Sequence, residues 1–246
     1  MIRHIDPEQL LFLDIETVPQ HRHYDELDEW GRELWEKKSK SFKEEGADAE
    51  ELYGKAALFA EFGKIVCISV AFFHQEGGER HLRITSYAQE SEGELLHAFA
   101  DLLERSFKKG ERLLCAHNGK NFDFPFIGRR MLINGITLPP PLRVAEMKPW
   151  EMPFFDTMEL WRFGERGGTV SLDLLAYVLG IPSPKADIEG SEVGMLYWEE
   201  GDLDRIRTYC EKDVETLAQV LLRFRNEAIL PEDRIRFIEQ KEGGTT

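Results

Sequence analysis

Two acidic side chains near the start of the chain have the spacing of metal ligands. Asp14 and Glu16 close the run LLFLDIE, at residues 10–16, which is predicted to be a buried strand. Alternate residues of a strand point to the same face, so both carboxylates project together. They repel each other unless a cation lies between them, and hard divalent ions such as Mg²⁺ prefer oxygen ligands. The alternatives are a strand that ends in solvent and a phosphatase-like nucleophilic aspartate.

A third acid lies on the apolar side of the last predicted helix, at about residues 202–226. Apolar side chains recur there at helical spacing, and Asp213 falls within their stripe between Cys210 and Leu217. A charge on a core-facing stripe is costly unless it is paired or binds a metal. Tyr209 precedes Asp213 by four residues, so both side chains share one face of the helix. The alternative is a buried ion pair between Asp213 and an arginine.

A fourth acid, Asp123, lies in the segment HNGKNFDFPF, between a predicted strand and a predicted helix. It stands two residues before Pro125, where an aspartate near the helix N-terminus can serve simply as a cap. Asn118 and Gly119 indicate a turn at the start of the segment. By itself, this segment therefore does not separate a metal ligand from a helix cap.

The predicted strands and helices are the elements that hold these acids in place. Strands are predicted at residues 10–16, 64–73, 80–87 and 112–116. Gly77 and Gly78 predict a tight hairpin turn between the second and third strands. Helices are predicted to begin at Ser91, Pro125, Ser171 and residue 202. A hairpin followed by alternating helices and strands indicates a mixed α/β sheet with helices on its faces.

Three segments fall outside this pattern. Residues 20–62 are predicted to form a charged helical insert after the first strand. Its large apolar residues recur at roughly helical spacing: Trp30, Leu34, Trp35 and Phe42. The proline-rich stretch at 139–153 is predicted to be a lid or a surface strap. We expect one domain over residues 1–230 and a C-terminal extension at 231–246 with a frayed end.

The composition and the net charge indicate where the protein is located and which partners it can bind. Hydrophobic residues make up 42% of the 246 residues, and no apolar run reaches the length of a membrane span, about 18 residues. The N-terminal stretch lacks the features of a signal peptide, so we expect a cytoplasmic protein that binds no membrane. The formal net charge of −15 disfavours a long basic clamp on nucleic acid, but not a local site of carboxylates and metal. The cysteines lack CxxC spacing and are expected to be buried reduced thiols: Cys67, Cys115 and Cys210.

Together these segments resemble the motifs of the DEDD exonuclease superfamily. FLDIET is similar to its first motif, HNGKNFDFPF to its second, and YCEKD to its third motif in the tyrosine subtype. The closer resemblance, over about residues 8–226, is to the proofreading exonuclease domain of family B DNA polymerases and to stand-alone bacterial exonucleases of that kind. It extends to the stretches EFGKIVCISVA, FFDTMELW and SLDLLAYVLGIPSPK.

The resemblance implies a fold, a reaction and a set of residues. The implied fold is α/β, a ribonuclease-H-like mixed β-sheet flanked by helices. The implied reaction is metal-dependent 3′→5′ removal of nucleoside 5′-monophosphates from DNA that is single-stranded or frayed, with two divalent ions, Mg²⁺ or Mn²⁺, about 3.5–4 Å apart. Tyr209 would orient the attacking water. The implied catalytic acids and metal ligands are Asp14, Glu16, Asp123 and Asp213. The implied substrate contacts are Thr17, Asn118, Phe122 and Lys185.

Several of these side chains also have a structural interpretation. Phe122 would either stack near the terminal base or pack in the core. Lys185 would either contact a phosphate or be a solvated loop lysine. His117 is expected to be structural, whereas Arg129 and Arg130 are expected to add positive potential beside the site.

Three rival functions remain open at this point. A phosphatase would use Asp14 as a covalent nucleophile, but it usually carries a second aspartate two residues on and leaves Tyr209 and Asp213 unexplained. A non-catalytic nucleic-acid-binding scaffold would typically lack one of the acids, whereas all four are present. An RNA exonuclease would use the same chemistry, and contacts to a 2′-hydroxyl would distinguish it from a DNA enzyme. The resemblance to proofreading domains favours DNA 3′ ends, and it leaves any polymerase or repair partner undefined.

Overall fold

The computed structural model describes residues 5–42, 46–107, 112–182 and 188–238. Within these ranges six strands form one sheet, in the order β5-β4-β1-β2-β3-β6. The strands are β1 (Leu10–Pro19), β2 (Gly63–Glu76), β3 (Glu79–Ala88), β4 (Leu113–Ala116), β5 (Phe154–Asp156) and β6 (Ile235–Phe237). The α-helices are α1 (Glu29–Ser39), α2 (Glu92–Ser106), α3 (Asp123–Ile133), α4 (Thr157–Arg162), α5 (Leu172–Val178), α6 (Val193–Met195) and α7 (Leu203–Phe224).

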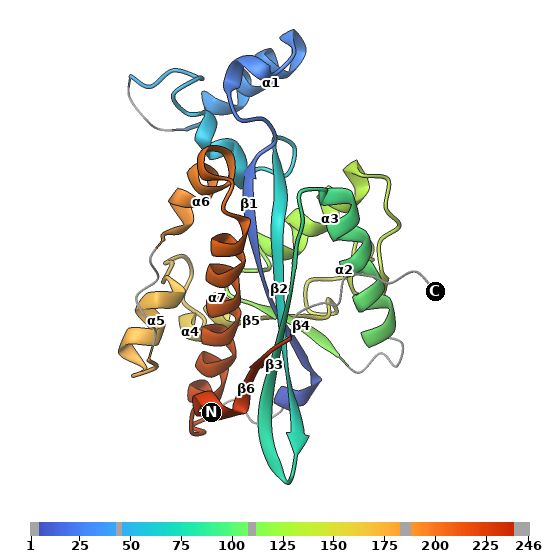
Figure 1. The fold of residues 1–246 in the computed structure, drawn as a ribbon, viewed down its shortest axis with the longest axis vertical. Helices are drawn as coiled ribbons and strands as arrows, with labels where there is room; N and C mark the ends of the chain where they lie inside the picture. The colour runs from blue at the N-terminus through green and yellow to red at the C-terminus, as the bar shows by residue number, and fades with distance from the viewer. Residues whose placement is uncertain (1–4, 43–45, 108–111, 183–187, 239–246) are drawn as a thin grey trace.

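The sheet is mixed, and helices cover both of its faces (Figure 1). The pairs β1–β2 and β2–β3 are antiparallel, whereas β4 pairs with β1, β5 with β4 and β6 with β3 in parallel. The helix α7 lies on one side of the sheet, and α2 and α3 lie on the other. This arrangement confirms the predicted mixed α/β fold.

The alternation of side chains along β1 decides where the first two acids point. One face packs beneath α2 and α3 through Leu11, Leu13 and Ile15. The other face packs against α7 through Leu10 and Phe12. Asp14 and Glu16 continue this second series, because side chains two apart on a strand share a face. The predicted strand therefore delivers both carboxylates to the side of the sheet that α7 covers.

Local signals explain most of the remaining elements. Gly77 and Gly78, with φ of 63° and 84°, form the two-residue turn of the β2–β3 hairpin, which confirms that prediction. Ser91 and Ser171 accept hydrogen bonds from backbone N–H groups in the first turns of α2 and α5, as their sequences predict. In the proline-rich stretch at 139–153, the described element is a 3₁₀ turn at Pro140–Leu142, and β5 begins directly after the stretch.

The insert at residues 20–62 is only partly helical. It contains α1 and two 3₁₀ turns, at Tyr24–Glu26 and Tyr53–Leu58. Trp35 is its buried centre and donates from Nε1 to the carbonyl of Ala49 at 2.7 Å. The side chains of Trp30 and Leu34, by contrast, are 60% and 39% exposed. The helical spacing thus predicted a helix correctly, but only one side of that short helix is covered.

No helix of the described chain combines the length and the apolar character that a membrane span requires. All three cysteines are buried and free, which confirms the expectation of reduced thiols.

Candidate active site

Asp14 lies where β1, the start of α3 and the middle of α7 meet. Burial raises the pKa of its carboxyl group well above the ordinary value, and repulsion from Asp213, Glu16 and Asp123 raises that pKa further. The charges of all four acids therefore act on one another across the site. Asp14 and Glu16 lie closest, with ligand atoms within 4.8 Å of each other and of Cys210.

Glu16 is the most deeply placed acid on β1, with 7% of its surface exposed. Burial raises its pKa well above the ordinary value, and repulsion from Asp213 is the next largest cause. Just after Glu16 the pairing between β1 and β2 shifts, since Glu16 faces Cys67 whereas Thr17 faces Ile65. Such a bulge bends a strand and increases its twist, a feature common beside active sites.

Asp123 is the first residue of α3 and is 4% exposed. Burial is the main cause that raises its pKa from 3.8 to about 7, and repulsion from Asp156 adds to it. Hydrogen bonds from the N–H groups of Asp123 itself and of Ile15 act in the opposite direction. The residue at the N-cap position is Phe122, so Asp123 is not the cap that the alternative interpretation supposed.

Asp213 and Tyr209 lie on the face of α7 that points toward β1. Burial raises the pKa of Asp213 from 3.8 to about 7, repulsion from Asp173 raises it further, and a hydrogen bond from Tyr209 lowers it. No arginine of the described ranges is among the causes that shift this pKa. The surroundings of Asp213 thus disfavour the alternative of a buried ion pair.

The phenol of Tyr209 is a proton donor in this environment. Burial raises its pKa above the ordinary value of 10.0, and repulsion from Asp213, Glu16 and Asp14 raises it further. The hydroxyl therefore keeps its proton at neutral pH and can donate a hydrogen bond, but it is a poor base.

The donor set fits hard divalent cations. The four carboxylates converge in a buried space, and the charges that act on them are those of other acids and thiols rather than of lysine or arginine in the described chain. Buried charges of one sign are stable only when they are protonated or balanced by a counter-charge. Oxygen ligands of this type are those that Mg²⁺ and Mn²⁺ prefer.

Asp156 supports the second motif, a role that the sequence analysis missed. It ends β5, is 3% exposed and accepts hydrogen bonds from the backbone N–H groups of Asn118 and Lys120 at 3.0 and 3.1 Å. It also accepts from Met158 N at 2.9 Å and so caps α4. The sequence signal that could have revealed it is an aspartate directly before a helix, in FFDTMEL.

His117 has the structural role that was expected of it. Its Nε2 lies 2.7 Å from the carbonyl of Val170, and its Nδ1 lies 2.9 Å from the hydroxyl of Thr157. A carbonyl only accepts, so Nε2 carries the proton. Burial lowers the pKa of this ring. Both nitrogens are thus engaged in holding the segment before α3.

The expected substrate contacts have different environments. Thr17 donates from its hydroxyl to the carbonyl of Ala57, at 2.8 Å, and so faces the insert. Asn118 has a φ of 63°, and its side-chain oxygen accepts from Asn121 Nδ2 at 2.8 Å. Phe122 packs against the core, with its ring centroid 5.3 Å from that of Phe126. Lys185 lies outside the described residues.

Arg130 differs from the expectation that it adds positive potential beside the site. Its side chain is buried and donates to Glu92 Oε1 from Nε at 2.8 Å, to Ala60 O from Nη1 at 2.9 Å and to Gln20 Oε1 from Nη2 at 2.9 Å. Glu92 neutralises it. Arg130 therefore links α2 and α3 to both ends of the insert and is not available to a substrate, whereas Arg129 is exposed.

A pocket of ≈ 680 Å³ lies between the insert and the segment before α7, and its lining residues do not include the four acids. We call it the insert pocket. Its lining includes Thr17, directly after Glu16, and Gly190. A Cβ placed on Gly190 would lie 3.9 Å from the hydroxyl of Tyr209, so the pocket reaches the vicinity of that phenol.

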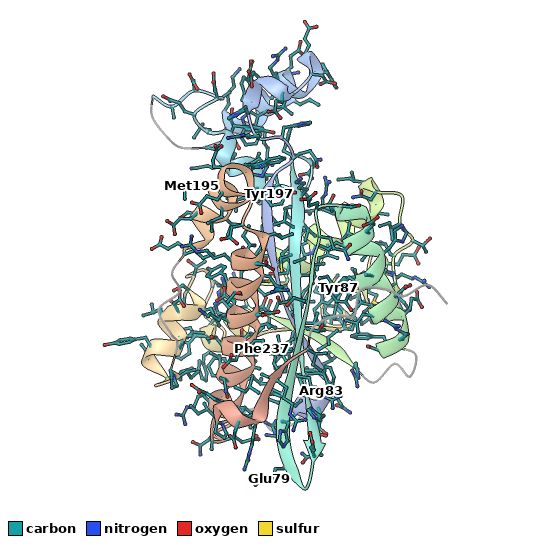
Figure 2. All side chains as sticks on the ribbon, in the orientation of Figure 1. Glu79, Arg83, Tyr87, Met195, Tyr197 and Phe237 are labelled. Atoms are coloured by element: carbon teal, nitrogen blue, oxygen red, sulfur yellow. The ribbon has the colours of Figure 1, made fainter. Side chains whose placement is uncertain are left out.

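The walls of the insert pocket carry exposed apolar side chains and are held together by polar contacts. Leu58 and Met195 are 57% and 49% exposed, and both line it. Met195 lies at the end of the molecule that carries the insert (Figure 2). Arg22 donates from Nε to Glu199 at 2.8 Å and so ties the insert to the π-helical turn at Leu196–Glu200.

Comparison with known proteins places this site in a family. Residues 57–229, more than half of the chain, match a family described as "Predicted 3'-5' exonuclease related to the exonuclease domain of PolB". The matched stretch contains Asp123, Tyr209 and Asp213. Asp14 and Glu16 lie on β1, which comes before the matched stretch. No curated protein matches the chain.

A solved structure shows the same fold. The family B DNA polymerase from the hyperthermophilic archaeon Pyrobaculum calidifontis matches 88% of this chain with a TM-score of 0.51 and 17% sequence identity. The match takes up 25% of the polymerase, so the chain spans about a quarter of that protein. The likeness confirms the ribonuclease-H-like fold of a polymerase exonuclease domain. The chain therefore belongs to the family of predicted 3′–5′ exonucleases related to the exonuclease domain of PolB.

Proposed function

We propose that the chain is a metal-dependent exonuclease that removes nucleoside 5′-monophosphates from the 3′ end of single-stranded or frayed DNA. The observation that carries the proposal is the convergence of four acids from three separate elements, with a protonated tyrosine beside them: Asp14, Glu16, Asp123, Asp213 and Tyr209. Family membership supports the reaction class. The polarity, the substrate and the metal requirement are part of the proposal.

The resemblance to proofreading exonuclease domains gives each acid a role. Asp14 lies among the other three and would contact both of two divalent ions. Glu16 and Asp213 would hold one ion, and Asp123 would hold the other. Bound divalent ions lower the pKa of a water molecule and stabilise the leaving oxygen of a phosphodiester.

Tyr209 would orient the attacking water. Its hydroxyl stays protonated because its pKa is raised, so it acts through a hydrogen bond and not as a general base. Asp213 accepts a hydrogen bond from this phenol, which fixes the side chain on the face of α7 that looks toward β1. The proton of the water would pass to solvent, since the nearby carboxylates would be occupied as ligands.

The insert pocket would receive the end of the strand. Bases that are not stacked in a duplex stack on apolar and aromatic side chains, largely independently of sequence. Exposed Leu58 and Met195 offer such surfaces beside Thr17. A local pocket also agrees with a net charge of −15, which disfavours extended contacts with a long phosphate backbone.

The substrate class is tested by offering the protein two matched oligonucleotides. DNA and RNA of one sequence, each labelled at its 5′ end, are incubated with Mg²⁺, with Mn²⁺ or with EDTA. The proposal predicts faster shortening of DNA than of RNA under either metal, and none in EDTA. Faster shortening of RNA would move the assignment to an RNA exonuclease on the same site. Binding of the oligonucleotide without cleavage under any metal would support a non-catalytic scaffold.

A further inference from the structure

The thiol of Cys210 lies against the acids and has no role in the proposed reaction. Its sulfur is 3.5 Å from Asp14 Oδ2 and 3.4 Å from the carbonyl oxygen of Asp14. Ligand atoms of Asp14, Glu16 and Cys210 all lie within 4.8 Å of one another. Cys210 is fully buried, and Glu16 is 7% exposed, so these donors face one another in a closed space.

The thiol donates a hydrogen bond to Asp14 Oδ2, and the separation of the two atoms also matches the one that a small tetrahedral cation requires. Zn²⁺ binds sulfur at about 2.3 Å and carboxylate oxygen at about 2.0 Å, and at the tetrahedral angle these bonds hold sulfur and oxygen about 3.5 Å apart. The sulfur of Cys210 and Oδ2 of Asp14 are 3.5 Å apart. Glu16 has to approach by less than the length of one bond to supply a third ligand.

The chemistry of the donors separates two classes of cation. Hard ions such as Mg²⁺ take oxygen ligands and gain nothing from a thiolate, whereas Zn²⁺ and Cd²⁺ bind thiolate strongly. Three protein ligands around a tetrahedral ion leave one position for water or a substrate oxygen. A thiophilic ion held in this way would use the carboxylates that the proposed function assigns to Mg²⁺ or Mn²⁺.

We propose that Cys210, with Asp14 and Glu16, forms a second mode of metal binding, a thiolate–carboxylate site for Zn²⁺ or Cd²⁺ that excludes the hard ions of the proposed nuclease reaction. The consequence, inhibition of the nuclease by Zn²⁺ or Cd²⁺, rests on the proposed function. The site itself follows from the three side chains.

The other cysteines provide matched controls. Cys67 lies on β2 opposite Glu16 and interacts with Cys210, but it is not one of the three donors. Cys115 lies on β4 in the core against α7 and is equally buried. If the thiol of Cys210 is merely a small apolar side chain in the core, its replacement and that of Cys115 should have the same effect on metal binding.

The test titrates Cd²⁺ into the metal-free full-length protein and records the ultraviolet charge-transfer band of a cadmium–thiolate bond. The proposal predicts the band in the native protein and in the C67S and C115S variants, and its loss in C210S. Calorimetry should show the affinity of C210S for Cd²⁺ reduced by at least about tenfold, since even an outer-shell partner of a metal is worth that much. The affinity for Mg²⁺ should change far less.

Two results would overturn the proposal: a C210S variant that keeps the full band, or a native protein that binds Cd²⁺ without the band. Cadmium NMR of the unmodified protein distinguishes sulfur from all-oxygen ligation and needs no variant, so misfolding of C210S would not obscure the answer. Neither readout needs nuclease activity. A cadmium–thiolate band in a protein that does not cleave DNA with Mg²⁺ or Mn²⁺ would refute the proposed function alone. Cleavage with those ions by a protein that gives no cadmium–thiolate band would refute this inference alone.

Discussion

The carboxylate of Asp123, at the start of α3, accepts a hydrogen bond from the backbone N–H of Ile15 in β1. Ile15 separates Asp14 from Glu16, and its side chain packs into the core beneath α2 and α3. The pairing of β4 with β1 ends at Phe12, so beyond that residue Asp123 takes the place of a strand partner. This interaction sets the second motif beside the first on two rigid elements, the kind of support that a precisely spaced metal site requires.

Replacing Asp14 with Asn should reduce nuclease activity and raise the stability of the metal-free protein. The amide removes a ligand, and a loss of several kcal/mol in transition-state stabilisation lowers kcat at least about 100-fold. The same change removes the repulsion that Asp14 shares with three other acids, so thermal melting in EDTA should occur at a higher temperature. The exposed Asp101 on α2 provides the control, and Asp101→Asn should change neither quantity. A D14N variant that is inactive but also less stable would contradict this explanation.

The stabilising effect of metal should grow with pH. A carboxyl group with a higher pKa in the folded than in the unfolded chain makes the folded state less stable as pH rises between the two values. Burial raises the pKa of Asp123 and of Asp213 from 3.8 to about 7, so the metal-free protein should lose stability between about pH 4 and pH 7. Melting with and without Mn²⁺ should show a larger increase in Tm at pH 8 than at pH 5.5. Equal increases at both values would mean that these carboxyls are not the ligands.

Replacing Tyr209 with Phe should lower kcat about 10- to 100-fold and leave the shape of the pH–rate profile unchanged. The phenol donates a hydrogen bond and keeps its proton, because its pKa is raised by burial and by the acids around it. A pH profile measured to pH 10 should therefore show no alkaline limb that disappears in the variant. Tyr177 on α5 is 82% exposed, and Tyr177→Phe is the matched control. An alkaline limb lost only in Y209F would instead identify the tyrosine as a base.

Breaking the buried ion pair between Arg130 and Glu92 should be among the more destabilising changes outside the site. Arg130→Met leaves Glu92 as an uncompensated buried charge, which typically costs about 3–5 kcal/mol in the free energy of unfolding. Urea denaturation measures this loss. Arg143, paired with Glu104 at 3.3 Å, has a half-exposed side chain, so Arg143→Met should cost less than about 1 kcal/mol. Equal losses in the two variants would show that burial of the pair is not what matters.

The insert pocket should affect binding of the strand more than its cleavage. Covering a leucine side chain with a base removes apolar surface from water, and full burial of such a side chain is worth about 1.5–3 kcal/mol. Leu58→Ser should therefore raise the KM for single-stranded DNA at least about fivefold, with kcat within about twofold of the native value. Leu132 on α3 is 64% exposed, similar to the 57% of Leu58, and Leu132→Ser serves as the control. An unchanged KM in L58S would exclude this wall of the insert pocket from the path of the strand.

The sequence predicted the parts of the site that local pattern encodes. The strand with Asp14 and the helix with Asp213 were recognisable because hydrophobic periodicity defines the faces of both elements. The strands β5 and β6 are three residues long and show too little alternation to be recognised. β6 also extends the sheet into the segment expected as a C-terminal extension, by pairing with β3.

Features that depend on contacts between distant segments could not be predicted. The bulge after Glu16 follows from how β1 and β2 are aligned, and the approach of Cys210 to Asp14 follows from how α7 packs on the sheet. Asp156 and Arg130 likewise have roles that only their partners define. The acids can be identified from sequence motifs, whereas the residues that contact and support them are determined by tertiary packing.

The most direct test of the account follows a 5′-labelled single-stranded DNA over time, with Mn²⁺ or EDTA and beside the D14N and D101N variants. A metal-dependent 3′→5′ exonuclease should give a ladder that shortens from the 3′ end and release nucleoside 5′-monophosphates, in the native protein and in D101N only, with no cleavage in EDTA. Release of the 5′ label as the first product, or a ladder that persists in EDTA or in D14N, would contradict a metal-dependent 3′→5′ exonuclease built on these four acids.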